Sequence, residues 1–208
     1  MKKLSQYKEE AENIVVITLG DPAGIGAEIT LKALGSSYLP QTMQPLLIGC
    51  KRTLQHTYLK LKSQGIRELA NPDELEIKNL PLTKTLIEGQ ANAHTGKASF
   101  DWLTKGTEIL LENKARALVT APIAKYAWEQ AGFNYPGQTE RLGELSNIQN
   151  PSMLFTAKSP YSSFRLNTLL ATTHIPLEDV PKNLTPKLVW EKLDTLLSFC
   201  QKFKKNPR

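Results

Sequence analysis

The sequence predicts an α/β protein organised on a parallel sheet. Short runs of apolar and β-branched residues, such as 14–19 and 117–121, are each followed by a stretch with helical periodicity. Gly, Pro and Asn residues separate these segments. Strands that alternate with helices pair in parallel, and a run that is apolar throughout is typical of a strand buried on both faces.

The first predicted strand, 14–19, leads into a glycine-rich turn at 20–28 and a helix at 29–34. A turn with Gly20, Gly24 and Gly26 lets backbone N–H groups approach a ligand beside a helix N-terminus, which favours anions. The spacing differs from the dinucleotide fingerprint G-x-G-x-x-G. Tight packing of the strand on the helix explains these glycines as well as ligand binding does.

The middle of the chain predicts a strand at 45–49, a helix at 51–64 closed by Gly65, and short edge strands at 75–77 and 80–82. His56 falls on the helix as a surface residue, and His94 falls in a polar loop. A helix at 98–113 follows and should cover the sheet, because one face carries Phe100, Leu103, Thr107, Leu110 and Leu111.

The next strand, 117–121, runs into Pro122, which suits the first turn of a helix that continues to Gln130 and stops at Gly132. Ligands collect beyond the carboxyl ends of parallel strands, so Thr120, Pro122 and Lys125 fall where a site is expected. An ordinary strand-to-helix turn is the alternative, and it is favoured for Pro122. Farther along, Thr139 is expected to cap a helix that ends near Leu145.

The last third predicts a polar linker at 147–152 and strands at 153–158 and 164–174. His174 ends the second of these strands, where a metal ligand, a base and a hydrogen-bonded loop histidine all remain open. Thr185 should cap a helix over 186–203. Its buried side is expected to comprise Leu188, Leu193, Leu196, Leu197 and Cys200.

Length and composition indicate a globular protein of one large or two small domains, with 208 residues and a hydrophobic fraction of 40%. The net charge is +6, but the basic residues are scattered among acids, and the one dense run, at 202–208, is interpreted as a solvated tail. Nucleic acid is therefore not expected as a partner. No apolar run reaches membrane-spanning length and residues 1–13 are polar, so we expect no membrane contact and a cytoplasmic protein. Cys50 and Cys200 should be reduced and buried or half-buried.

Four motifs stand in an order that resembles the 4-hydroxythreonine-4-phosphate dehydrogenase family. The chain reads G-D-P-A-G-I-G-A-E at 20–28, V-T-A-P-I-A-K at 119–125, G-Q-T-E at 137–140 and T-T-H-I-P-L at 172–177. The family typically shows G-D-P-A-G-I-G-P-E, V-T-G-P-x-x-K, G-H-T-E and T-T-H-x-P-L. The resemblance covers residues 14–208.

The resemblance implies an isopropylmalate-dehydrogenase-like fold, a three-layer α/β/α structure with two lobes. Residues 1–125 would form part of the first lobe and residues 126–208 part of the second. Two later family segments, G-L-N-P-H-A-G-E and Y-H-D-Q-G, have no counterpart. Both lobes are therefore expected to be incomplete and the chain less stable.

The implied activity is oxidation of 4-hydroxythreonine 4-phosphate by NAD or NADP, then decarboxylation to 3-amino-2-oxopropyl phosphate, in pyridoxal phosphate (vitamin B6) biosynthesis. The resemblance makes His174 one ligand of a divalent metal (Zn, Mg or Co) that acts as a Lewis acid, and Gln138 and Thr139 substrate contacts. Lys125 is a further substrate-binding candidate. Gln138 replaces the family's histidine and cannot carry a proton at neutral pH. A homodimer and a small phosphorylated substrate are implied as partners.

Two alternatives follow from the missing segments. The chain could be a catalytically inactive fragment that binds phosphorylated ligands or acts as an interaction module. It could also be one half of a split enzyme, in which case an added carboxyl-terminal fragment would restore activity.

Overall fold

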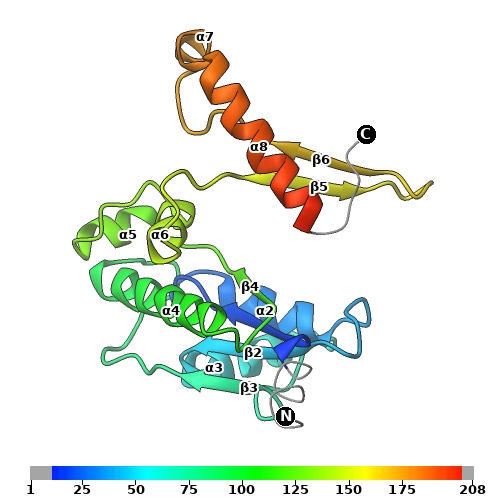
Figure 1. Ribbon diagram of the computed structural model, residues 1–208. Helices are drawn as coiled ribbons and strands as arrows, with labels where there is room; N and C mark the ends of the chain where they lie inside the picture. The colour runs from blue at the N-terminus through cyan, green and yellow to red at the C-terminus, as the bar shows by residue number, and fades with distance from the viewer. Residues whose placement is uncertain (1–10, 203–208) are drawn as a thin grey trace. The chain divides into compact units, whose positions relative to one another are not determined.

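The computed structural model describes residues 11–202, which form two compact units that divide between Asn147 and Ile148 (Figure 1). The two lobes expected at 1–125 and 126–208 stay a prediction about the family's fold. The basic run beyond Lys202 and the first ten residues lie outside the described residues.

The first unit holds the parallel sheet that the sequence predicts. Its strands are β1 (Ile14–Thr18), β2 (Gln44–Gly49), β3 (Glu76–Asn79) and β4 (Ala117–Thr120), in the order β3-β2-β1-β4 with every pair parallel. The strand predicted at 80–82 does not form. The N–H of Leu80 donates to the carbonyl of Gly49, and the ladder cannot continue because Pro81 has no N–H.

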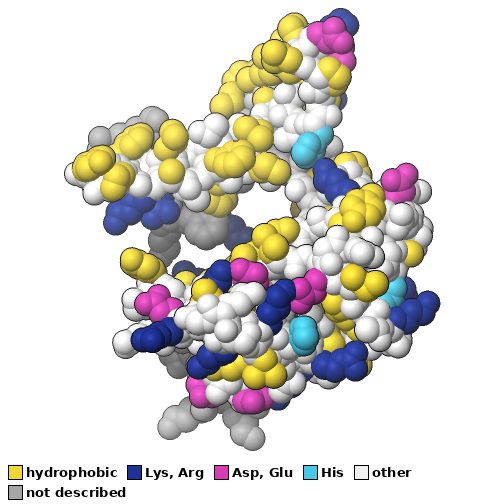
Figure 2. All heavy atoms as spheres, turned by 180° about the vertical axis from the view of Figure 1, so that it is seen from behind, with side chains coloured by type: hydrophobic (Ala, Val, Ile, Leu, Met, Phe, Trp, Pro, Cys, Tyr) yellow, Lys and Arg dark blue, Asp and Glu magenta, His cyan; other side chains and the backbone are white. Residues whose placement is uncertain are grey.

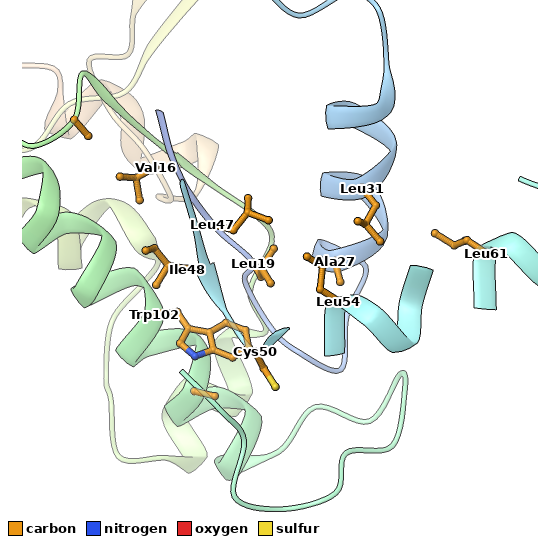
Figure 3. Packing of buried hydrophobic residues seen from close by; sticks show 12 residues of the cluster. Val16, Leu19, Ala27, Leu31, Leu47, Ile48, Cys50, Leu54, Leu61 and Trp102 are labelled. Atoms are coloured by element: carbon orange, nitrogen blue, oxygen red, sulfur yellow. The ribbon is translucent and has the colours of Figure 1, made fainter. Parts of the chain in front are cut away.

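Helices cover both faces of this sheet and confirm the predicted α/β fold class. They are α2 (Gly26–Gly35), α3 (Lys51–Ser63) and α4 (Ala93–Leu111), while α5 (Lys125–Gln130) and α6 (Gln138–Leu145) contact α4. Successive side chains of a strand point to opposite faces. On β2, Ile48 meets Trp102 of α4, while Leu47 points toward Leu31 of α2 (Figure 3). The result is three layers, with α4 on one side and α2 and α3 on the other.

Helix α4 begins earlier than predicted because a capping box fixes its start. The side chain of Asn92 accepts the N–H groups of His94 and Thr95, and the Thr95 hydroxyl accepts the N–H of Asn92. The prediction that His94 lies in a loop is therefore wrong. The predicted side is buried at its first three residues, but Phe100 packs against Trp128 and Phe133 and Leu111 is about half exposed at the last turn.

Of the two shorter helices, α5 begins later than expected and α6 begins earlier. Pro122 is not in a helix, because Ala124 is the extended N-cap of α5 and the Pro122 carbonyl accepts a hydrogen bond from the turn after β1. Thr139 is not a cap, because the extended N-cap of α6 is Gly137. Thr139 is instead the second residue of that helix.

The second unit contains an antiparallel hairpin and a long helix. The hairpin pairs β5 (Leu154–Lys158) with β6 (Arg165–Leu169), and η1 (Leu177–Asp179), α7 (Val180–Asn183) and α8 (Pro186–Lys202) follow. The strand predicted to reach His174 is wrong, since β6 ends at Leu169. The last ladder bond joins Leu170 to Met153, and the partner strand is preceded by Pro151.

Helix α8 confirms one prediction and corrects another. Its capping residue is Thr185, whose hydroxyl accepts the N–H of Leu188. The predicted buried side is only partly buried: Cys200 is covered, whereas Leu193 and Leu197 are 50% and 43% exposed. Both Cys50 and Cys200 are free and buried, as predicted.

No helix in residues 11–202 is long and apolar enough to cross a membrane. Lysine and arginine side chains alternate with acidic ones over the visible face of the first unit, as Figure 2 shows. A concentrated basic surface, the usual footprint of a nucleic-acid site, is not seen on that face.

Candidate functional site

The turn at residues 20–26 packs directly against the end of β4. Gly20 has φ +67°, and a Cβ there would lie 2.2 Å from the carbonyl oxygen of Pro122. A Cβ at Gly26 would lie 1.9 Å from the carbonyl oxygen of Leu19. Close backbone packing therefore explains these two glycines. Gly24 is exposed and has more room.

This turn lies at the topological switch point of the sheet. From β1 the chain proceeds outward to β2 and β3, then returns to place β4 on the other side of β1. The turns that follow β1 and β4 therefore meet at one edge, where the Asp21 N–H donates to the Pro122 carbonyl (N···O 2.9 Å). Open α/β sheets bind ligands at this place.

Gln138 reaches the same edge from the first turn of α6. Its Nε2 donates to the carbonyl oxygen of Ala121 (3.3 Å), and its Oε1 is buried without a hydrogen-bond partner. Lys125 is exposed at the start of α5. Its Nζ lies 4.0 Å from where a Cβ of Gly137 would stand. The structure thus brings Gln138 to the end of β4 and Lys125 close to Gly137, and Thr139 follows Gln138 in a half-buried position.

Buried polar atoms without partners concentrate at this helix. Among residues 11–202, four such side-chain atoms occur, and three belong to α6: Gln138 Oε1, Glu140 Oε2 and Arg141 Nε. Native proteins pair nearly all their buried polar groups, so each exception needs an explanation. A bound ligand that donates a hydrogen bond would satisfy Gln138 Oε1, which is an acceptor at the sheet edge.

Arg141 holds α6 against α4, and the sequence prediction missed it. Its guanidinium lies 4.5 Å from the centre of the Phe100 ring, and it donates to Thr104 Oγ1 (3.2 Å) and Glu144 Oε2 (2.9 Å). Hydrogen bonds from Tyr135 and Arg141 lower the pKa of the Glu144 carboxyl. The sequence signal was available, since aromatic residues recur on α4 and just before α6. Which side chain these aromatic residues would contact could not be predicted, because that contact depends on packing between segments distant in sequence.

Asp21 is a second residue whose role the sequence did not show. Its carboxyl is almost fully buried. The N–H of Ala23 donates to Oδ1 (2.8 Å), and the hydroxyl of Thr95 donates to Oδ2 (3.1 Å). Burial raises the pKa of this carboxyl, and the two hydrogen bonds oppose that rise.

A groove of about 1070 Å³ opens beside the turn. Its walls are residues 22–25 of the turn, helix α3 and the segment 82–89. On α3, Arg52, His56 and Lys60 stand four residues apart and therefore share one face. His56 Nε2 lies 3.6 Å from Glu88 Oε1, and Lys60 pairs with the same carboxylate. Among the described residues, Arg52 forms no ion pair.

His174 lies in the second unit, five residues beyond β6. It is exposed and has φ +57°. Within residues 11–202, no group of three or more His, Cys, Asp or Glu side chains is arranged to hold a metal ion. The metal-ligand role of His174 therefore stays a prediction.

Sequence comparison gives a consistent result. The family described as pyridoxal phosphate biosynthetic protein PdxA matches residues 41–208. The chain is 53% identical over 194 residues to the 4-hydroxythreonine-4-phosphate dehydrogenase of Synechococcus sp. (strain RCC307), covering 93% of this chain and 58% of that one. It is 43% identical over 192 residues to the enzyme of that name from Synechococcus sp. (strain JA-3-3Ab), covering 90% and 55%.

Solved structures agree with the sequence matches. The 4-hydroxythreonine-4-phosphate dehydrogenase from Klebsiella pneumoniae has a TM-score of 0.77 at 27% identity, over 91% of this chain and 59% of that one. The enzyme of that name from Burkholderia phymatum has a TM-score of 0.73 at 28% identity, over 88% and 56%. The chain thus spans a little over half the length of the curated relatives it matches.

Proposed function

This chain belongs to the family of pyridoxal phosphate biosynthetic protein PdxA, and from that membership we propose that it acts as a 4-hydroxythreonine-4-phosphate dehydrogenase. The reaction oxidises the secondary alcohol of the substrate to a ketone, and the resulting β-keto acid loses carbon dioxide to give 3-amino-2-oxopropyl phosphate. In this role the protein would serve vitamin B6 biosynthesis in the cytoplasm.

One observation carries the assignment to a site. The side chain of Gln138 is fixed at the switch point by its bond to Ala121, yet its Oε1 is buried and unpaired. An acceptor in that state is stabilised by a ligand that donates a hydrogen bond to it. The hydroxyl or ammonium group of the substrate can supply that bond.

The neighbouring residues suit the remaining groups of the substrate. We assign the exposed ammonium of Lys125 to the phosphate, since a flexible cation close to Gly137 can approach an anion from the solvent side. Thr139 would add a hydroxyl. An amide neither gains nor loses a proton at neutral pH, so Gln138 orients the substrate, and another group must take the alcohol proton.

The groove beside the turn fits the dinucleotide that the reaction needs. Its volume of about 1070 Å³ exceeds that of most drug-sized sites. Arg52 is available for a pyrophosphate, while Ile25 and Leu86 offer apolar surface to a base. When bound, the nicotinamide of NAD or NADP accepts the hydride from the substrate carbon.

Binding of the dinucleotide to the groove can be tested without turnover. Replacing Arg52 with Gln should weaken NADH binding, measured by the fluorescence of the nicotinamide, by about tenfold, because one charge-assisted contact is lost. Lys62 is the matched control, since it lies on the same helix but does not line the groove. Equal affinities for Arg52→Gln and Lys62→Gln would place the dinucleotide elsewhere.

The divalent metal has a weaker basis in this chain. A metal site normally takes three or more protein donors, and residues 11–202 bring no such set together. We propose His174 as one ligand of the divalent ion.

A homodimer is supported by apolar side chains on the second unit. Large hydrophobic residues are exposed on both the hairpin and α8, where Figure 2 shows yellow surface: Phe155, Phe164, Leu166, Trp190, Leu193 and Leu197. Exposed large hydrophobic side chains on both elements are typical of a surface that another chain covers. Sedimentation of the chain at several concentrations tests the dimer.

The activity is tested by NADH formation from 4-hydroxythreonine 4-phosphate. Gln138→Ala should lower kcat/KM by roughly 10-fold to 100-fold, the effect of losing one hydrogen bond to a charged or strongly polar partner. Gln138→His should retain activity. Gln130→Ala, an exposed glutamine at the end of α5, is the control. The proposal is wrong if the wild-type chain forms no NADH.

A further inference from the structure

Asp21 is the one acidic side chain of the first unit that is almost completely buried, at 3% exposure among the described residues. Carboxylates are rarely buried to this degree unless their environment pairs them. Here the pairing is specific: one oxygen accepts the N–H of Ala23 within the turn, and the other accepts the hydroxyl of Thr95 on α4. A charge-assisted hydrogen bond of this type is stronger than a neutral one.

The turn that carries Asp21 contacts both parts of the candidate site. Residues 22–25 form one wall of the groove. On the other side, the N–H of Asp21 donates to the carbonyl of Pro122, and the preceding carbonyl, that of Ala121, receives Gln138 Nε2. A displacement of the turn would therefore alter the groove and the Gln138 contact together.

Other hydrogen bonds hold this turn to itself, to the start of α2 and to neighbouring loops. The N–H of Gly24 donates to the Asp21 carbonyl, and the N–H of Gly89 donates to the Ala23 carbonyl. Within residues 11–202, the bond from Thr95 to Asp21 is the hydrogen bond that joins the turn to α4. Thr95 is itself fixed, because it is fully buried and belongs to the capping box of that helix.

We propose that Asp21 is a positioning residue that holds the turn at 20–26 to the first turn of α4. This link keeps the dinucleotide groove and the Gln138 side chain at fixed positions relative to each other. The proposal rests on the proposed function for its catalytic meaning. Asp21 acts through the backbone of the turn and not by touching the substrate.

The test compares variants that remove the link with variants that keep it. Asp21→Ala removes both bonds, and Thr95→Val removes the hydroxyl at nearly constant volume. Asp21→Asn and Thr95→Ser keep a partner in each position, since an amide Nδ2 can donate to the Thr95 hydroxyl. Thr107→Val is the matched control: Thr107 is also buried on α4, but its hydroxyl bonds to the carbonyl of Leu103 in its own helix.

Two measurements are made on each purified variant. Hydrogen exchange of the Asp21, Ala23 and Gly24 amides reports whether the turn opens, and NADH fluorescence reports the affinity of the groove. Asp21→Ala and Thr95→Val should speed exchange of these amides and weaken NADH binding, each by about tenfold. The Asn, Ser and Thr107 variants should stay within about twofold of wild type.

The outcomes separate this inference from the proposed function. Unchanged exchange in both Asp21→Ala and Thr95→Val overturns the positioning role, even where the chain is an active dehydrogenase. The positioning role is also overturned if Thr107→Val speeds exchange of the turn's amides as much as Asp21→Ala and Thr95→Val do. Faster exchange in the two link variants, with rescue by Asn and Ser, supports it even where wild-type chain fails to bind NADH, and that failure counts against the proposed dinucleotide groove alone.

Discussion

The two units of this chain differ in how they bury apolar side chains. In the first unit, residues from the sheet and from helices on both faces form one core that includes Val16, Leu31, Leu47 and Trp102 (Figure 3). In the second unit, Cys200 is the one buried hydrophobic residue among those described. Its hairpin and its long helix form, yet most of their large apolar side chains remain in contact with solvent.

The difference shows which interactions each unit relies on. Helix and hairpin formation depends on local hydrogen bonds, caps and turns, and these are present in both units. A core requires segments distant in sequence to cover one another, and it supplies most of the free energy of folding. We therefore expect the stability of the first unit to be intrinsic. That of the second should depend on whatever covers its apolar surface.

The largest predicted contrast is between two tryptophans. Trp102 is 2% exposed in the core of the first unit, and Trp190 is 67% exposed on α8. Trp102→Ala should lower the free energy of unfolding by about 3–5 kcal/mol through lost burial and a residual cavity. Trp190→Ala should change it by less than about 0.5 kcal/mol. Urea unfolding followed by circular dichroism measures both, and similar losses would show that α8 is covered in solution.

Much of the first unit could be predicted because its signals are local. The β-branched runs at 14–18 and 117–120 became parallel strands, and the glycine-rich turn fell at their carboxyl ends. Boundaries were less certain where a capping residue decided them. Asn92, and not the apolar periodicity of α4, set the start of that helix, and the extended Gly137 took the capping position expected for Thr139.

The substrate-binding roles of Gln138 and Lys125 stay predictions. Gln138 donates to the Ala121 carbonyl at the sheet edge, and Lys125 lies close to Gly137. Arg141 and Asp21 were missed, because their partners Phe100 and Thr95 are 41 and 74 residues away in sequence. The position of His174 was wrong, since the length of β6 depends on a partner strand that begins only after Pro151.

A smaller contrast concerns two residues with left-handed backbone conformations. Gly20 in the first unit has φ +67° and no space for a side chain, whereas His174 in the second has φ +57° and is exposed. Gly20→Ala should lower the free energy of unfolding by about 2–4 kcal/mol, because alanine is unfavourable at this positive φ and its Cβ would collide with the Pro122 carbonyl. His174→Ala should lower the free energy of unfolding by less than about 0.5 kcal/mol, because histidine and alanine bear the same backbone strain at this position.

Thermal unfolding of these two variants measures that contrast. A stable Gly20→Ala protein would mean that the turn can move away from Pro122. The packing of β1 against β4 at the candidate site would then be looser than the structure indicates.

The smallest predicted contrast concerns two acids and depends on pH. Burial raises the pKa of Asp21 above its ordinary value of 3.8. Below that value the carboxyl is protonated in both folded and unfolded chains, and its full contribution to stability is present. As pH rises toward the raised folded pKa, the unfolded chain loses its proton first, so that contribution is lost.

Asp21→Asn has no such proton and should therefore gain stability relative to wild type as pH rises from acid to neutral. Asp194→Asn, on the exposed surface of α8, is the control for the acid-to-amide substitution itself. Urea unfolding of the three proteins at several pH values gives both differences. A constant offset for Asp21→Asn would mean that the carboxyl is solvated in the folded chain, and the first unit would then be less closed at its site than at its core.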